Sequence, residues 1–154
     1  MDRRIFAVGS VLAGLGVVFG AFGAHALKAS LSPKMLDIFE TGVRYQMYHG
    51  LGLLALAWAI SRWPERRLVP AAWLLLAGTM IFSGSLYLLV LSEARWFGSI
   101  TPFGGVALIV GWGLVAWRLV CPEPSRMQGS PSPGTENSGV ESADGSPKPR
   151  SVRL

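Results

Sequence analysis

The sequence predicts an all-α fold, a four-helix transmembrane bundle with an interfacial amphipathic helix between spans one and two. Four apolar stretches, at residues 5–27, 43–60, 68–91 and 101–120, are the basis of this prediction. A membrane-spanning helix needs about 20 predominantly apolar residues at a rise of about 1.5 Å each, and each stretch approaches or exceeds that length. The composition agrees, because 51% of the residues are hydrophobic and only 15% are charged.

The placement of the charges argues against a nucleic-acid-binding protein, although the net charge is +5. Lysines and arginines lie at the ends of the apolar stretches and form no single basic patch. This pattern is typical of membrane orientation, so we expect the lipid bilayer as a partner and no nucleic acid. The single cysteine, Cys121, excludes an intrachain disulfide and lies where the fourth stretch ends.

The same charges predict the orientation, because basic residues are enriched on the cytoplasmic side of membrane proteins. Seven basic residues lie on the side of the N-terminus: Arg3, Arg4, Arg62, Arg66, Arg67, Arg118 and Arg126. Four lie on the opposite side: Lys28, Lys34, Arg44 and Arg95. We therefore expect a multi-pass protein of the plasma (inner) membrane with both termini in the cytoplasm.

The first stretch is predicted to be an uncleaved spanning helix that packs closely on a neighbour. Its apolar run at residues 5–22 is longer than the roughly 7–15 residues of a signal-peptide core, which disfavours cleavage near Ala24. Gly16, Gly20 and Ala24 recur every four residues and form a small-residue face. Such faces let helices approach closely in lipid, where no hydrophobic force drives their association.

The next segment predicts an amphipathic helix that begins at Ser32 and Pro33, a favourable N-cap and first-turn pair. Four residues at positions i, i+3, i+4 and i+7 form its polar face: Asp37, Glu40, Thr41 and Arg44. Glu40 and Arg44 have the favourable order for an i, i+4 ion pair worth about 0.2–0.5 kcal/mol. We expect this helix to lie in the outer interface and to run into the second span.

The third and fourth stretches carry polar and small residues toward their outer ends. Three polar side chains mark the outer half of the third stretch: Ser83, Ser85 and Tyr87. The fourth begins with Thr101, a predicted helix cap, which a proline follows. Gly104 and Gly105 come next and are predicted helix-packing positions.

Placed on this topology, the polar side chains gather in the outer leaflet and predict a small polar pocket that opens outward. Its predicted members are His25, Glu40, Arg44, Gln46, His49, Ser83, Ser85, Tyr87 and Thr101. Polar groups inside a membrane point toward the protein interior and mark functional sites. The alternative is that they only hydrogen-bond one helix to another, at about 0.6 kcal/mol per contact.

Four motifs in order carry a resemblance to a known family. They are GAFGAHALK at residues 20–28, TGVRYQMYH at 41–49, SGSLY at 83–87 and ITPFGG at 100–105. With them the chain resembles the small membrane proteins grouped as domain-of-unknown-function family 423, the YgdD-like proteins, from residue 5 to 117. The resemblance implies a four-helix integral membrane protein and brings no established activity.

Residues 1–121 are thus predicted to form one membrane domain and residues 122–154 a disordered cytoplasmic tail. The tail holds six prolines and many serines and glycines, and shows no apolar periodicity. Such a segment cannot bury enough apolar surface to offset the entropy of ordering it.

Three functional hypotheses follow. The preferred one is a non-enzymatic structural, accessory or partner-binding bundle, with a membrane protein or a second copy of the chain as partner, no catalytic residues and no cofactor. The second is a small-molecule binder or carrier that uses the predicted pocket. The third is a haem or metal site with His25 and His49 as ligands at similar depth, which needs Glu40 or Asp37 to complete a closed metal site.

Overall fold

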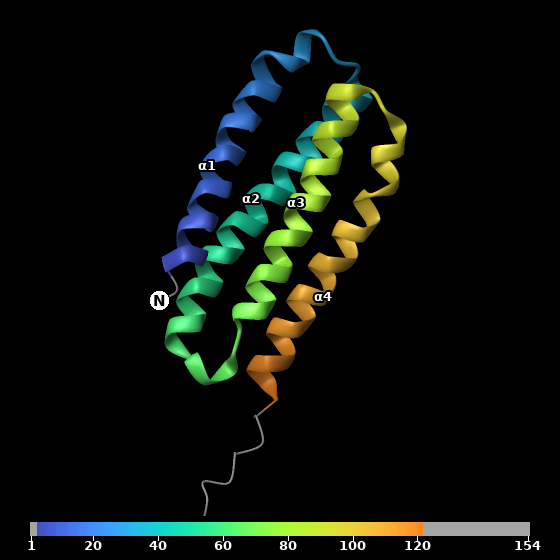
Figure 1. Cartoon of the computed structure of the whole chain (residues 1–154). Coiled ribbons are helices and arrows are strands. Elements are labelled where there is room, and N and C mark those ends of the chain that lie inside the picture. Colours follow the sequence, from blue (N-terminus) through green and yellow to red (C-terminus); the bar gives the residue numbers. More distant parts are fainter. Residues whose placement is uncertain (1–2, 122–154) are drawn as a thin grey trace, which may run out of the picture. The chain divides into compact units, whose positions relative to one another are not determined.

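The computed structural model describes residues 3–121, and these residues form the predicted all-α fold. Four long helices run alternately up and down beside one another (Figure 1). The helices are α1 (Arg3–His25), α2 (Pro33–Arg62), α3 (Val69–Ser92) and α4 (Thr101–Val120). Short 3₁₀ turns join them: η1 (Leu27–Ala29), η2 (Pro64–Arg66) and η3 (Arg95–Ser99). The predicted tail, residues 122–154, lies outside the described residues.

Three of the helices, α1, α3 and α4, are long and apolar enough to cross a membrane. The predicted second span is part of α2, which has 30 residues but does not reach the same apolar standard. Arg44, Gln46 and His49 lower the hydropathy of the first half of the predicted span, residues 43–60. Since α2 packs against both α1 and α3, protein rather than lipid covers much of its surface. Its place in the four-helix membrane fold therefore depends on its neighbours.

The predicted amphipathic segment forms the first turns of α2, and the helix continues without a break into the predicted span. Ser32 caps it as predicted, because its hydroxyl accepts a hydrogen bond from the Met35 backbone N–H at 3.4 Å. At the start of α4 the prediction was wrong. Ile100 is the N-cap and Thr101 is already the first helical residue, and its hydroxyl contacts Ser85 of α3.

The helices form an open row rather than a closed ring. Within residues 3–121, extensive helix-to-helix packing joins only neighbours in sequence: α1 with α2, α2 with α3, and α3 with α4. Helices α1 and α4 therefore lie at the two edges of the row, as their separation in Figure 1 also shows. Each edge helix leaves one side unpartnered by the described part of the chain.

Glycines set the closest approaches between helices. A Cβ atom added to Gly9 would lie 2.9 Å from the Gly50 carbonyl oxygen, and one added to Gly50 would lie 2.9 Å from the Ala13 nitrogen. On the other side of the row, a Cβ at Gly104 would lie 2.5 Å from the Phe82 nitrogen. Real Cβ atoms do not approach backbone this closely, so only glycine fits at these three positions.

The predicted small-residue face of α1 takes part in this packing only in its lower part. Gly16 is buried, and a Cβ there would meet the Met47 side chain at 3.2 Å. Gly20 faces Val43 at an ordinary 3.5 Å, and Ala24 is exposed. In α4, Gly105 likewise has ordinary contacts, at 3.7 Å from the Phe82 ring.

Two apolar clusters fill the interior and leave a polar layer between them. The larger cluster includes Leu12, Leu53 and Leu75, and the smaller one consists of Leu27, Phe39 and Val90. Between these levels lie the buried polar residues of the described chain: Gln46, His49, Thr79, Ser83 and Ser85. We call these five residues the polar layer, and it is where the candidate site is built.

Candidate functional site

Gln46 joins three helices through one side chain. It is 5% exposed, and its Nε2 donates to the Leu12 carbonyl oxygen of α1 at 2.9 Å. Its Oε1 accepts a hydrogen bond from the Tyr87 hydroxyl of α3 at 3.0 Å. Because Leu12 lies near the middle of α1, Gln46 lies deeper in the membrane than the outer position that the sequence predicted.

The Tyr87 ring is fixed by packing around it. The ring centroids of Phe19 and Phe39 each lie 5.1 Å from that of Tyr87. A Cβ on Gly42 would lie 2.8 Å from the Tyr87 ring, so α2 must have glycine where the ring crosses it. These contacts hold the hydroxyl group at Gln46.

A second pair of polar side chains joins α3 to α4. The hydroxyl oxygens of Ser85 and Thr101 lie 2.8 Å apart, and Ser85 also bonds the Phe82 carbonyl oxygen at 2.9 Å. Both residues were predicted members of the polar pocket. In the structure they pair with each other across the interface between the two helices.

The two histidines lie apart in depth, contrary to the prediction of similar depth. His25 is exposed at the end of α1, whereas His49 is 8% exposed. Gly23, two residues before His25, packs on Phe39 of α2. Phe39 precedes His49 by ten residues, or about 15 Å along α2, so the two histidines lie at different depths. The sequence reasoning failed because it placed the segment before residue 43 in the membrane interface, whereas this segment packs beside the end of α1 as the first turns of α2.

His49 is held as a packing residue. Its Nδ1 lies 2.7 Å from the Tyr45 carbonyl oxygen, which can only accept, so the proton sits on Nδ1. The Tyr45 ring stacks on the imidazole at 6.1 Å, and the Trp112 ring of α4 lies 6.3 Å away. Within residues 3–121, no three His, Cys, Asp or Glu side chains come close enough together to hold a metal ion.

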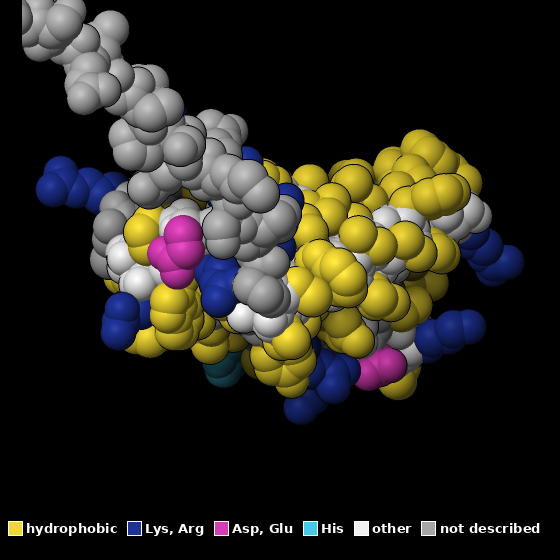
Figure 2. All heavy atoms as spheres, turned by 90° about the horizontal axis from the view of Figure 1, so that it is seen from below, with side chains coloured by type: hydrophobic (Ala, Val, Ile, Leu, Met, Phe, Trp, Pro, Cys, Tyr) yellow, Lys and Arg dark blue, Asp and Glu magenta, His cyan; other side chains and the backbone are white. Residues whose placement is uncertain are grey.

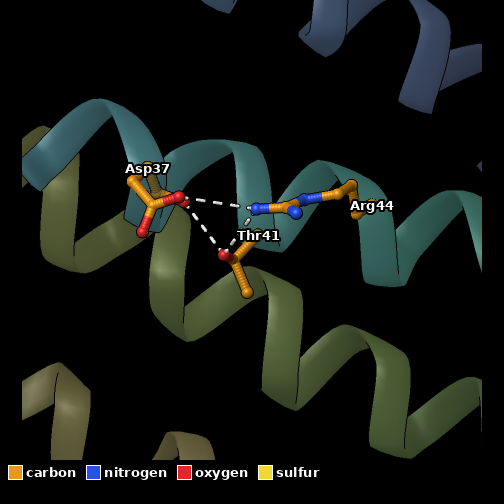
Figure 3. Close-up of polar contacts among 3 residues, drawn as sticks. All are labelled: Asp37, Thr41 and Arg44. Atoms are coloured by element: carbon orange, nitrogen blue, oxygen red, sulfur yellow. Dashed lines mark hydrogen bonds and ion pairs between the residues drawn. The ribbon is translucent and has the colours of Figure 1, made fainter. Parts of the chain in front are cut away.

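The charged residues at the start of α2 pair differently from the prediction. Arg44 Nη2 lies 3.5 Å from Asp37 Oδ1 and 3.3 Å from the Thr41 hydroxyl oxygen, as Figure 3 shows. Among the described residues Glu40 has no ion-pair partner, so the predicted Glu40–Arg44 pair is wrong. Asp37 lies on the same helical face, and the long arginine side chain reaches back two turns to it. Both partners are largely exposed, so the pair contributes little to stability.

Two clefts take the place of a single polar pocket. The first, about 220 Å³, lies between α1 and α2 near the outer end. Its lining residues are Gly20, Gly23, Phe39, Glu40, Val43 and Arg44. The nine predicted pocket residues are therefore divided: Glu40 and Arg44 line this cleft, Ser85 pairs with Thr101, and His25 and His49 line neither cleft.

The second cleft, also about 220 Å³, lies between α1 and α3, and α2 forms its back wall. Three predicted residues line it: Gln46, Ser83 and Tyr87. Ser83 is 2% exposed, and its hydroxyl oxygen has no hydrogen-bond partner in the described part of the chain. A buried, unsatisfied hydroxyl costs about 1–3 kcal/mol, and no bulk water is present in the bilayer core to reduce that cost.

Basic side chains gather at the end of the molecule that holds Arg3, the turn η2 and the end of α4. Arg66 Nη1 donates to the carbonyl oxygens of Cys121 at 3.0 Å and Arg118 at 3.4 Å, where α4 ends. Figure 2, seen toward this end, shows Lys and Arg side chains beside a broad hydrophobic surface. Sequence reasoning did not find the Arg66 contacts, because Arg66 lies more than 50 positions from both of its partners.

Known proteins are similar in sequence to this chain over most of its helical region. A family model described as a protein of unknown function (DUF423) matches residues 19–105. A UPF0382 membrane protein of Staphylococcus saprophyticus is 48% identical over 110 residues, which is 71% of this chain and 91% of the relative. No solved structure matches.

Two other relatives have similar coverage. The UPF0382 membrane protein YwdK of Bacillus subtilis is 41% identical over 119 residues, 76% of this chain and 97% of YwdK. The UPF0382 inner membrane protein YgdD of Escherichia coli is 37% identical over 116 residues, 75% of this chain and 88% of YgdD.

Proposed function

Since the chain belongs to the DUF423 family, membrane proteins of unknown function, we propose that it is a non-enzymatic bundle that binds a partner within the membrane. The observation that supports this most is the open row of helices. The edge helices α1 and α4 each pack extensively on one neighbour only, which leaves room for a helix of another protein on either side.

The polar layer supports a packing role rather than catalysis. No Asp, Glu, Lys or Arg is among the buried polar residues of the described chain. Gln46 and Ser85 bond other helices, while His49 and Thr79 bond carbonyl oxygens of their own helix. Hydrogen bonds of this kind stabilise and orient helices, and they leave no acid–base pair for proton transfer.

The free side of α1 is suited to a helical partner. Small and β-branched residues repeat there with the three- and four-residue spacing of one helix face: Ala7, Val11, Gly14, Val18 and Ala21, all exposed. A Cβ on Gly14 would meet nothing within 4 Å among the described residues, so packing inside the chain does not require this glycine. A second helix could approach such a face closely.

Photo-crosslinking from inside the membrane tests the proposal. A photoreactive residue at Val18, 59% exposed, should give a protein adduct of one size in cells, and its mass distinguishes a second copy from another protein. The same residue at Leu75, 1% exposed, should give only intramolecular products. Lipid adducts alone at Val18, and also at Ile109 on α4, would contradict partner binding.

We also infer an inner-membrane location with both termini in the cytoplasm. One relative is named an inner membrane protein. Arg3, Arg4, Arg66 and Arg118 belong to one end of the molecule, and basic residues favour the cytoplasmic side.

A further inference from the structure

We propose that the cleft between α1 and α3 binds a small lipophilic molecule that carries a carbonyl oxygen and enters from the bilayer. This ligand site goes beyond partner binding, and it concerns the inner side of α1 rather than the free one. It rests on the Ser83 hydroxyl, on the size and lining of the cleft, and on its depth.

The Ser83 hydroxyl is an unsatisfied hydrogen-bond donor. It is a donor buried in a low-dielectric region, and within residues 3–121 it is the one buried side-chain polar atom without a hydrogen-bond partner. The neighbouring hydroxyls are already engaged as donors, Thr79 to the Leu75 carbonyl oxygen at 2.7 Å and Tyr87 to Gln46. A carbonyl oxygen on the ligand would satisfy the remaining donor, because a carbonyl accepts without needing an acceptor itself.

The rest of the lining is apolar and leaves room for a ring. The cleft holds about 220 Å³, more than the cavity of about 150 Å³ that accommodates benzene in another protein. Leu12, Leu15 and Phe19 line it from α1, and the edge-to-face pair of Phe19 and Tyr87 gives it an aromatic wall. A Cβ on Gly84 would meet nothing within 4 Å in the described chain, so this lining position is open space.

The depth of the cleft argues against a phospholipid as the ligand. Leu15 and Met80 at its mouth are 42% and 57% exposed in the middle of spanning helices, so the cleft opens toward lipid tails. Ser83 lies nine residues before the end of α3, about 14 Å along the helix. The ester carbonyls of phospholipids lie at the edge of a hydrocarbon core about 30 Å thick, so they do not reach this depth. A small molecule dissolved in the bilayer can reach the depth of Ser83.

The test measures binding of duroquinone, a methylated ring with two carbonyl groups. The full chain is placed in phospholipid nanodiscs, and saturable binding of the labelled compound is measured above that of empty nanodiscs. Durene, the same methylated ring without carbonyl groups, serves as the matched ligand control. We expect saturable binding of duroquinone that is tighter than that of durene. No saturable binding, or equal binding of the two compounds, would overturn the proposal.

Two variants test the named residues. Ser83→Ala should weaken duroquinone binding about 2- to 13-fold, the range of one hydrogen bond, and leave durene binding unchanged. Gly84→Leu should abolish binding of both compounds by filling the cleft. Gly113→Leu is the control, because Gly113 on α4 also faces open space among the described residues but is not among the lining residues of the cleft.

The folded state of each variant is checked by its thermal unfolding, and Gly84→Ala replaces Gly84→Leu if the larger side chain disturbs the helix. Unchanged duroquinone affinity in Ser83→Ala would contradict the assigned hydrogen bond. A phospholipid that remains bound after purification and blocks duroquinone would overturn the choice of ligand. Since photo-crosslinking from Val18 does not depend on the cleft, failure of one proposal is distinguishable from failure of the other.

Discussion

The buried side chain of Gln46 on α2 hydrogen-bonds both neighbouring helices, α1 and α3. Each of its two bonds ends on a different helix. In the membrane such a bond contributes about 0.6 kcal/mol on average and up to about 1.7 kcal/mol, because an unfolded chain also finds partners. Removing the amide affects both bonds and leaves the Tyr87 hydroxyl unsatisfied.

We therefore expect Gln46→Leu to lower the free energy of unfolding in detergent by about 1–2 kcal/mol. Tyr87→Phe should lower it by less, and the double variant should cost less than the sum, because the two residues share one bond. Ser10→Ala is the control, since the Ser10 hydroxyl is exposed and bonds only its own helix. Additive losses would show that Gln46 and Tyr87 do not interact.

Single residues were predictable where the interaction is local. The Ser32 cap depends on residues next to it, and the structure confirms it. The ion pair of Arg44 was not predictable, because Asp37 and Glu40 lie on the same exposed face. An exposed ion pair contributes only about 0–1 kcal/mol, which is too little to favour one partner over the other. The unsatisfied Ser83 hydroxyl depends on three helices at once, and sequence spacing carries no information about it.

At the scale of elements, α1 and α2 meet where Gly9, Ala13 and Gly50 bring the two backbones together. Any larger side chain must push the helices apart, and the dispersion contacts on both sides of the crossing weaken with distance. Glycine in a helix normally costs about 0.8–1.0 kcal/mol relative to alanine, so replacing it is favourable where space is free.

The same substitution should thus have opposite effects at two positions. Gly50→Ala is expected to destabilise the chain by about 1–3 kcal/mol, because its Cβ would lie 2.9 Å from the Ala13 nitrogen. Gly14→Ala should leave stability unchanged or raise it by up to about 1 kcal/mol. Unfolding in a detergent series measures both. Equal effects would mean that α1 and α2 do not cross at Gly50.

The crossing of α3 and α4 gives an independent comparison. Gly104→Ala should destabilise by about 1–3 kcal/mol, since a Cβ there would overlap the Phe82 backbone. Gly113→Ala lies on the same helix and faces open space among the described residues, so it should be neutral. A neutral Gly104→Ala would contradict the packing of α3 on α4.

The helices themselves were largely predictable, and their crossings were not. Apolar stretches placed three of the four helices within about two residues, because length and hydropathy are properties of the segment alone. α2 started ten residues before the predicted span, since a capped amphipathic segment continues the helix outside the hydrocarbon. The sequence offered Gly16 and Gly20 as the packing face, but where two helices cross depends on both partners.

For the whole molecule, the distribution of charge between the two ends decides the orientation. The turns η2 and η3 lie at opposite ends of the helices. The exposed Glu65 lies in η2, and the exposed Glu93 follows α3 shortly before η3. Basic residues near Glu65, including Arg62, Arg66 and Arg67, favour the cytoplasm for that end.

Cysteine labelling tests this orientation with the two glutamates as matched sites. In a Cys121→Ser background, Glu93→Cys should react with a membrane-impermeant thiol reagent added to intact cells. Glu65→Cys should react only after the membrane is opened or inverted. The reverse pattern would place both termini outside, and reaction at both sites in intact cells would contradict an even number of spans.

The candidate site was predictable in its members more than in its arrangement. Gln46, Ser83 and Tyr87 were predicted together and line one cleft. His49 lies deeper than His25 because the first turns of α2, which were predicted to lie in the interface, pack beside the end of α1. Ser85 and Thr101 separate from the cleft because they pair between α3 and α4. Relative depth between helices depends on where each one starts, and a hydropathy pattern locates the middle of a span better than its ends.

The open row has a consequence for biosynthesis. Because each helix packs mainly on the helix made just before or just after it, each of these interfaces can close as soon as the second member of a pair has left the ribosome. Extensive helix packing within residues 3–121 needs no pairing of a late helix with a distant early one, so loop-closure entropy stays small and assembly should keep pace with translation. Exchanging the order of the α1–α2 and α3–α4 hairpins in the gene would keep the interface within each hairpin. The α2–α3 interface would then join segments that are no longer neighbours in the chain.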